Sequence, residues 1–507
     1  MKMLKHTEDY ILSTEVDRWL FHADILVDKA HVVMLKEQGI IKKDAAAAIL
    51  NCLTSLEERS ADFIEDELPG YEDVHTAIES VVIQEIGEDV GGRMHTGRSR
   101  NDEVATCIRI ALRTELFELL RAVNGLRRAL LEKAREHLDT IMPGYTHLQH
   151  AQATTFAHHL LAYTDALARD FSRLIIAYEH TNVSPLGAAA FASTGFPIDR
   201  DRTASLLGFD AVLEHSMDAV STRDFIIEAI ASFSNLMINI SRLAEEFILW
   251  STSEFDFITI DADYVTGSSI MPQKRNPDYA ELVRARTGTV YGCLMSGLSI
   301  CKALPYSYNR DLQEVTPHLL RAVRTTTASV TVMKGMVEGL EVKLEKMEKQ
   351  APVGFTAATE LADTIVRETC ISFRTAHKIV SALASSLRDE DWDWDRDWDS
   401  QRIDELTLKI TGTGQKLSDT ATGRELNLNE KSVKEALKIA SNIQKRNVKG
   451  GPAKKEVKRM MQQREKNLAT DEKTRLEKEE YVKKSFDLLE REVQRKKRIV
   501  KLIKMNR

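Results

Sequence analysis

Five long stretches between residues 104 and 350 repeat apolar side chains at the spacing of one helix face. The first ends near residue 139 and carries the repeat Val104, Ile108, Leu112, Leu116 and Leu119. The others span residues 153–180, 219–250, 277–303 and 311–348. At a rise of ~1.5 Å per residue such helices reach about 40–55 Å, which is too long for the core of a compact monomer. We expect a bundle, and the apolar stripes left over predict association with other subunits.

The scarcity of turn residues supports long helices throughout the chain. Of 507 residues only 10 are proline and 23 are glycine, whereas Ala, Leu, Glu and Lys are abundant. We therefore expect an all-α fold with three helical domains. These are an N-terminal domain (1–94), a central domain built on the five-helix bundle (95–350) and a C-terminal domain (351–452), followed by a charged helical tail (453–507).

The composition also excludes several classes of protein. Hydrophobic residues make up 43% of the chain and charged residues 29%, and no run of ~18 apolar residues indicates a membrane span. The N-terminal residues lack the apolar core of a signal peptide, so a cytoplasmic location is expected. The five cysteines are far apart and are interpreted as small core residues. The sequence contains no Gly-rich phosphate loop, dinucleotide fingerprint or metal-ligand spacing, so neither a cofactor nor a metal is expected.

The tail raises the question of nucleic-acid binding. Basic residues outnumber acidic ones beyond residue 453, although the net charge of the chain is −7. Acidic residues are interleaved with the basic ones at helical spacing, which favours a solvated charged helix over a nucleic-acid surface. We therefore expect no nucleic-acid partner, and we expect that the tail beyond about Val457 is dispensable.

The stretch 266–278 combines glycine, two serines and a lysine just before a helix. Asn276 and Pro277 are interpreted as the N-cap and first residue of that helix. A helix N-terminus carries unpaired N–H groups and partial positive charge, and Lys274 stands beside it. The stretch is therefore predicted to hold an anion. The alternative is an ordinary capped surface loop.

A second polar motif, at residues 95–102, holds a histidine, two arginines, two hydroxyls and an amide. Such donors make poor core residues, because buried charges need partners. Arginine binds carboxylates bidentately, and neutral donors fix their orientation. The motif therefore predicts a carboxylate site, with a basic surface loop as the alternative.

A third motif, residues 142–152, begins with a Pro-Gly turn that exposes Thr146 and His147. A histidine in such a loop is either a titratable site residue or merely solvated, and the residues alone do not decide.

Together these motifs resemble a known family. The string at 266–278 is similar to the signature loop of the fumarase/aspartase superfamily, whose members cleave C–N or C–O bonds to release fumarate. Taken together with the 95–102 motif, its amino-acid sequence is most similar to that of the argininosuccinate lyase family. The resemblance covers roughly residues 8–455. It implies cleavage of argininosuccinate to arginine and fumarate by base-catalysed β-elimination. It also implies a homotetramer in which each active site is built from three chains.

The resemblance further implies roles for single residues. Ser268 is the expected base, and Lys274 and Asn276 are expected to hold the developing anion. His147, polarised by Glu281, is expected to assist proton transfer, while the general acid stays open. The expected substrate contacts are Ser99, Arg100, Asn101, Thr146, Arg223, Tyr308 and Gln313.

Some positions depart from the family pattern or stay undecided. Thr316 stands where many relatives have a carboxylate-binding lysine, and Asp28 where many have a substrate-contacting serine. His75 is either a capped surface histidine or a site residue. The acidic, tryptophan-rich segment 389–398 is expected to be a surface loop, with partner docking as the lesser alternative.

Two other functions remain open from the sequence. Adenylosuccinate lyase has the same chemistry on a purine nucleotide, but the wording of residues 95–102 argues against it. A non-catalytic, crystallin-like protein is the rival of another class, and the presence of Ser268, Lys274 and His147 disfavours it. An assay with both substrates separates the three.

Overall fold

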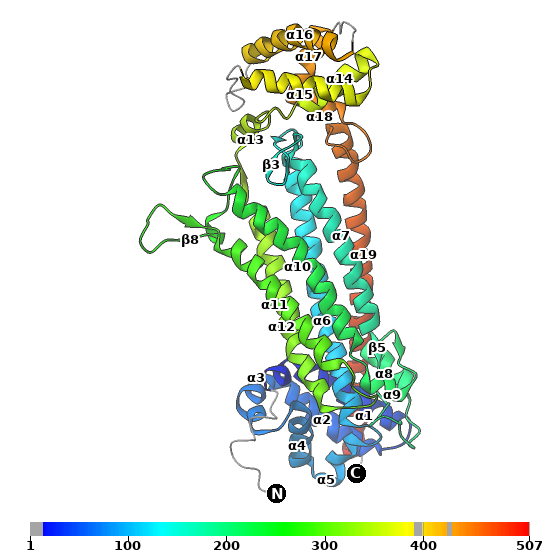
Figure 1. The fold of residues 1–507 in the computed structure, drawn as a ribbon. Helices are drawn as coiled ribbons and strands as arrows, with labels where there is room; N and C mark the ends of the chain where they lie inside the picture. Colours follow the sequence, from blue (N-terminus) through cyan, green and yellow to red (C-terminus); the bar gives the residue numbers. More distant parts are fainter. Residues whose placement is uncertain (1–13, 390–397, 399, 423–427, 506–507) are drawn as a thin grey trace.

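The computed structural model describes residues 14–389, 398, 400–422 and 428–505 and shows an elongated, almost entirely helical chain (Figure 1). In these residues the strands form only five two-stranded pairs. The expected all-α fold is therefore confirmed. No helix of this described part is both long enough and apolar enough to cross a lipid bilayer.

The five predicted long helices are present and pack side by side. They are α6 (Arg100–Glu136), α7 (Phe156–Thr181), α10 (Asp224–Trp250), α11 (Asp278–Cys301) and α12 (Val315–Glu338). α6 packs against α7 and α12, and α10 packs against α7, α11 and α12. A capping box starts α6, since the Ser99 hydroxyl accepts from the Asn101 amide (3.3 Å) and the Ser99 amide donates to Asp102 (3.0 Å). This cap fixes where the 95–102 motif meets the bundle.

Further helices surround the lower end of the bundle in Figure 1. They are α1 (Thr14–Glu37), α2 (Lys43–Glu58), α3 (Ser60–Asp62), α4 (Val74–Ile86), α5 (Glu88–Gly91), α8 (Arg200–Leu207) and α9 (Ser216–Ser221). The parallel strands β5 (Val183–Ser184) and β6 (Ala211–Val212) lie beside them. One continuous apolar cluster, which includes Phe21, Leu53 and Leu112, joins these helices to the bundle. The N-terminal helices are thus held rigidly against the bundle end.

At the upper end in Figure 1, a separate helical layer has its own core. It comprises α14 (Ala358–Thr369), α15 (Phe373–Asp389), α16 (Ser400–Thr422), α17 (Glu430–Leu437) and α18 (Ile439–Lys445), linked to the bundle by α13 (Leu344–Gln350). Leu361, Leu383 and Leu406 lie in this second core. The expected surface loop at 389–398 lies outside the described residues apart from its two ends. At one of these ends, the Trp398 ring stacks on Phe355 with 6.5 Å between centroids.

The charged tail forms one helix of 52 residues, α19 (Lys454–Met505), which runs along α6 and α7 from the upper layer to the N-terminal helices (Figure 1). Val457, Leu489 and Val493 on its inner face are fully buried. The completely buried ammonium of Lys29 lies 2.5 Å from Glu57 and 2.7 Å from Glu490 of α19. The tail is therefore not solvated on all sides, as the sequence suggested, whereas its dispensability for activity stays a prediction. Most charged residues of α19 do lie on a solvated face, as expected. The opposite face of the helix is apolar and packs against the bundle.

We expect that deleting residues 469–507 lowers the free energy of unfolding by at least about 3 kcal/mol. The deletion exposes the surface covered by Leu489 and Val493, each contributing ~1.5–3 kcal/mol, and leaves Lys29 buried with Glu57 as its remaining carboxylate. Urea titration followed by circular dichroism measures the change. Glu480→Gln is the control, since Glu480 pairs with Lys484 on the exposed face of α19 and such solvent-screened pairs add little to stability. A truncated chain as stable as the full one would show that α19 is not structural.

Candidate active site

A cavity of about 400 Å³ opens where the N-terminal helices meet the lower end of the bundle. Five of the substrate contacts expected from the sequence line it: Arg100, Asn101, Arg223, Tyr308 and Gln313. These residues come from four separate places in the sequence. The fold therefore assembles a polar cavity from side chains of the predicted type.

The cap of α6 places two of these residues. Arg100 donates to the Thr76 hydroxyl (2.6 Å) and lies 3.0 Å from the Asp73 carboxylate. Asn101 donates to the carbonyl of Ala190 (3.0 Å). Ser99, expected as a further contact, is not among the lining residues, because its hydroxyl caps the helix instead.

Two other residues that line the cavity, Arg223 and Tyr308, have pKa values that are shifted by burial. Arg223 is almost fully buried and donates to the carbonyls of Val220 (3.3 Å) and Thr222 (2.8 Å). Burial lowers the pKa of Arg223 to about 10, and burial raises the pKa of Tyr308, although the nearby Arg223 opposes that rise. Both groups keep their ordinary charge at neutral pH.

His75, which the sequence left undecided, lies in the cavity wall and is only 6% exposed. Its Nδ1 is 2.8 Å from Oδ2 of Asp24 on α1. Burial by itself lowers the pKa of His75, but Asp24 outweighs it, and the pKa is raised to about 10. The pairing joins residues 51 positions apart, so no local sequence signal could have identified it.

Asp28 does not line the cavity. It is buried and pairs with Arg98, which also lies 2.9 Å from Glu103. Burial raises the pKa of Asp28 to about 6 despite the attraction of Arg98. In this chain position 28 belongs to a buried ion-pair cluster behind the cavity, which differs from the expected substrate position. Thr316, in contrast, does line the cavity.

Two groups in this cluster have donor atoms close enough to hold a metal ion: Asp24 with His75 and Cys107, and Asp24 with Asp28 and Glu103. In each group the ligand atoms lie within 4.8 Å of one another. The cations in contact with these carboxylates are the side chains of Arg98 and His75. Since the carboxylates already hold these two cations, we assign no metal here.

Thr146 and His147 lie at the other end of the bundle, in the hairpin of β2 (Tyr145–Thr146) and β3 (Gln149–His150) (Figure 1). Thr146 pairs with Gln149, so His147 and Leu148 form a two-residue turn in which both have positive φ, 57° and 58°. Such turns normally use Asn and Gly, and larger residues are strained there. The exposed His147 therefore lies at the tip of the hairpin in a strained backbone conformation, which the Pro-Gly signal did not reveal.

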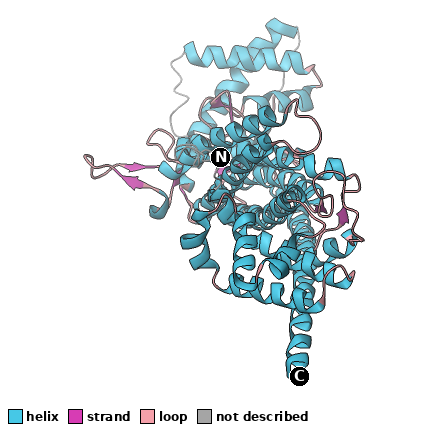
Figure 2. Cartoon of the chain, turned by 90° about the horizontal axis from the view of Figure 1, so that it is seen from below, coloured by secondary structure: helices cyan, strands magenta, loops and turns pink. Residues whose placement is uncertain are grey.

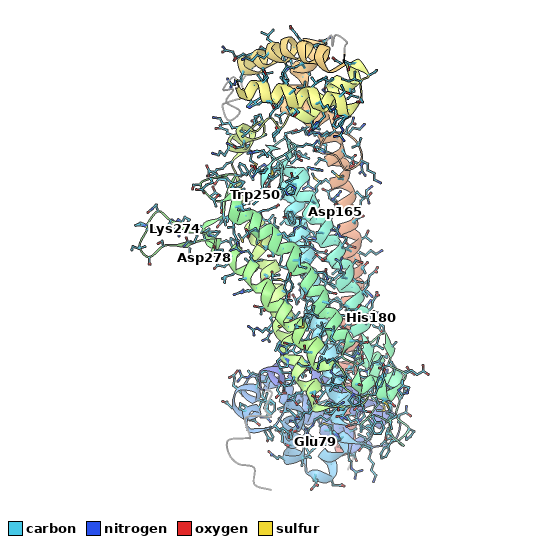
Figure 3. All side chains as sticks on the ribbon, viewed as in Figure 1. Glu79, Asp165, His180, Trp250, Lys274 and Asp278 are labelled. Carbon is cyan, nitrogen blue, oxygen red and sulfur yellow. The ribbon has the colours of Figure 1, made fainter. Side chains whose placement is uncertain are left out.

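The signature stretch forms a second hairpin, from β8 (Thr266–Gly267) and β9 (Arg275–Asn276), which stands away from the bundle in both views (Figures 1 and 2). The Ser268 hydroxyl accepts from the amides of Ile270 (3.3 Å) and Met271 (3.1 Å). Lys274 is exposed on the projecting loop (Figure 3). The interpretation of Asn276 as the N-cap of α11 is wrong, because α11 begins at Asp278 after Pro277. Asn276 instead pairs with Thr266 as a strand residue.

The expected site residues thus lie in three separate places of one chain. In Figure 3 Lys274 projects to the side, whereas Glu79 of α4, the helix that carries His75, lies at the lower end and Trp250 lies near the upper end. Among the described residues no hydrogen bond or ion pair joins His147 to Glu281, which is exposed in the first turn of α11. One chain alone therefore does not form the expected His147–Glu281 pair.

Comparisons with known proteins agree with these features. Residues 5–292 match the lyase family, and residues 355–444 match the argininosuccinate lyase C-terminal family. The argininosuccinate lyase of Methanosarcina barkeri is 54% identical over 90% of both chains, and that of Methanocaldococcus jannaschii is 45% identical over 95% of both. The crystal structure of EDDS lyase in complex with formate superposes with a TM-score of 0.85 at 31% identity, covering 97% of this chain and 95% of that one. The chain belongs to the argininosuccinate lyase family of the fumarase/aspartase superfamily.

Proposed function

We propose that the chain cleaves argininosuccinate to arginine and fumarate in arginine biosynthesis, in the cytoplasm and as a homotetramer. The relatives at 45–54% identity are argininosuccinate lyases, which supports the reaction. The observation that carries the proposal here is the cavity in which Arg100, Asn101, Arg223, Tyr308 and Gln313 converge. Its guanidinium, amide and phenol groups suit a substrate with several carboxylates.

In the proposed reaction Ser268 takes a proton from the succinyl carbon next to a carboxylate. The electron pair left behind forms the double bond of fumarate as the bond to the guanidino nitrogen breaks, and that nitrogen gains a proton. Lys274 and Asn276 stabilise the negative charge that develops on the carboxylate. A serine is a weak base, and the two amides that donate to Ser268 stabilise its ionised form.

His147 and Glu281 are proposed to act together in proton transfer, with Thr146 contacting the substrate. Because they lie apart in one chain, the pair requires another copy. The projecting hairpin likewise places Ser268 and Lys274 away from the cavity of their own chain, as Figure 3 illustrates for Lys274. We propose that each site combines the cavity, the His147 hairpin and the signature hairpin of three different chains.

The surface of α11 supports such an assembly. Tyr279, Leu282, Tyr291, Met295 and Leu298 are 37–64% exposed on this helix. On the same helix Gly288 and Gly292 face open space, since a Cβ at either would meet nothing within 4 Å. An exposed helix with an apolar surface and two glycines suits close packing against another helix.

We therefore expect that Gly292→Leu breaks the tetramer and abolishes most activity. The substitution has room within its own chain but blocks close approach of a second helix. Gly412→Leu is the matched control, because Gly412 is also a helical glycine facing open space but lies in α16 of the upper layer. Light scattering after size-exclusion chromatography measures the mass. A variant at Gly292 that stays tetrameric would contradict the proposed packing of α11.

A coupled comparison of substrates tests the proposed reaction. Purified protein is given argininosuccinate or adenylosuccinate, and product is followed by absorbance. Turnover of argininosuccinate alone is expected. Turnover of adenylosuccinate instead would favour that rival, and turnover of neither would favour a crystallin-like protein.

A further inference from the structure

The cavity contains three arginines, and each of them already has a partner within the chain. Arg100 is paired with Asp73 and Thr76, and Arg310 lies 2.9 Å from Glu72. Arg223 donates to two backbone carbonyls. A substrate carboxylate that enters therefore meets guanidinium groups that the protein already engages, although Nε of Arg223 is buried without a partner.

His75 differs from them. Its ring is one wall of the cavity and is more than nine-tenths buried. Nδ1 faces Asp24 at 2.8 Å, whereas Nε2 makes no hydrogen bond to any residue that the structure describes. Nε2 is not among the fully buried side-chain atoms that lack a partner, so it keeps access to the cavity and can donate to a ligand or water there.

The groups around the ring keep it charged. Asp24 on α1, Glu103 on α6 and Asp73 at the start of α4 all act on His75 in the same direction, and burial opposes them. Arg98, which lies between Asp28 and Glu103, holds the pKa of Asp24 low together with His75 despite its burial. Asp24 is therefore ionised and His75 is an imidazolium at neutral pH. Nε2 then carries a proton that it can donate.

We propose that His75 determines substrate affinity by donating from Nε2 to a substrate carboxylate in this cavity, and that Asp24 is the positioning residue that keeps this donor charged. The inference rests on the proposed function, since it takes the cavity as part of the substrate site. It also bears on Thr316, a buried neutral residue of the same cavity where a lysine was expected. His75 supplies a positive charge to the cavity wall that Thr316 does not.

The main test compares wild type with Asp24→Asn and His75→Gln. Asparagine keeps the volume of Asp24 but removes the charge, so burial lowers the pKa of His75 and the ring becomes neutral. Losing one charge-assisted hydrogen bond is expected to raise KM for argininosuccinate about tenfold or more, with kcat changed far less. His75→Gln keeps a neutral donor and is expected to raise KM similarly. Circular dichroism and light scattering confirm that each variant folds and assembles.

A pH series separates this role from a purely structural one. In Asp24→Asn the ring of His75 still binds a proton at low pH. The ratio of the variant's KM to the wild-type KM is therefore expected to fall towards one as the pH decreases from 8 to 5.5. His75→Gln cannot titrate, and its KM ratio should stay flat. A ratio for Asp24→Asn that is equally flat would overturn the proposal.

Thr316→Lys provides a rescue. In the His75→Gln background it returns a cation to the same cavity and is expected to recover most of the lost affinity. Inhibition by arginine and by fumarate identifies which half of the substrate carries the carboxylate, because the variants should bind one product more weakly. Unchanged inhibition by both products would contradict the proposal.

Arg100→Ala distinguishes failure of the proposed role of His75 from failure of the proposed substrate site. If Arg100→Ala raises KM and neither His75→Gln nor Asp24→Asn does, the role of His75 is wrong and the substrate site stands. If Arg100→Ala also leaves KM unchanged, the cavity is not the substrate site and the proposed function of these residues fails with it.

Discussion

Replacing Ser268 with alanine is expected to lower kcat by about 10²–10⁴-fold while substrate still binds. Ser268 is proposed as the base, and its hydroxyl accepts from two backbone amides that favour the ionised oxygen. Loss of a proton-transfer group removes a contribution made in the transition state, so kcat falls more than KM changes. Steady-state kinetics with argininosuccinate measures both parameters.

The neighbouring Ser269 is the internal control for this experiment. It lies on the same loop and is exposed, but no hydrogen bond of its hydroxyl is found among the described residues. Ser269→Ala should therefore change kcat by less than a few fold. If Ser268→Ala keeps a near-normal kcat, the base assignment is wrong, and His147 becomes the first candidate to replace it.

Mixing Ser268→Ala with Arg100→Ala is expected to restore activity above that of either variant at subsaturating substrate. Each proposed site takes its signature hairpin and its cavity from different chains. In a randomly mixed tetramer about one quarter of the sites then receive an intact hairpin and an intact cavity together. Co-expression or joint refolding of the two variants, followed by the argininosuccinate assay, measures the recovered activity.

Ser268→Ala mixed with Lys274→Ala is the matched control. Both residues lie on the same hairpin, so neither variant can supply an intact signature hairpin to any site. No recovery of activity is therefore expected. Recovery in this control would mean that the gain has another cause. Absence of recovery in the first mixture would contradict sites shared between chains.

Much of the fold followed from local patterns. The apolar repeat beginning at Val104 predicted α6, and Ser99 with Asp102 carries the spacing of the capping box that starts it. These features depend on residues three or four positions apart, which a sequence displays directly. The buried face of α19 was also readable, because Met461, Leu468, Val482 and Leu489 are spaced at multiples of seven. The many charged residues of the tail directed attention to its charge pattern, and this apolar spacing was not considered.

The site was less predictable for a different physical reason. The residue type suited Arg100 to a carboxylate, and the family resemblance indicated Gln313, but their meeting in one cavity depends on packing between distant helices. The same holds for the pair of His75 with Asp24. The turn at His147 and Leu148 was missed because its backbone needs positive φ at residues that do not favour it. Tertiary contacts impose such a conformation against local preference.

The contact between Lys29 and Glu490 has a consequence for synthesis of the chain on the ribosome. The two residues are 461 positions apart, so the first helices emerge long before the carboxylate that completes the environment of Lys29. Until Glu490 emerges, α1 can bury Lys29 against Glu57 alone or leave it in water. The N-terminal region, although translated first, is therefore expected to reach its final packing only after the last helix is released, which exposes its nascent form to chaperones throughout translation.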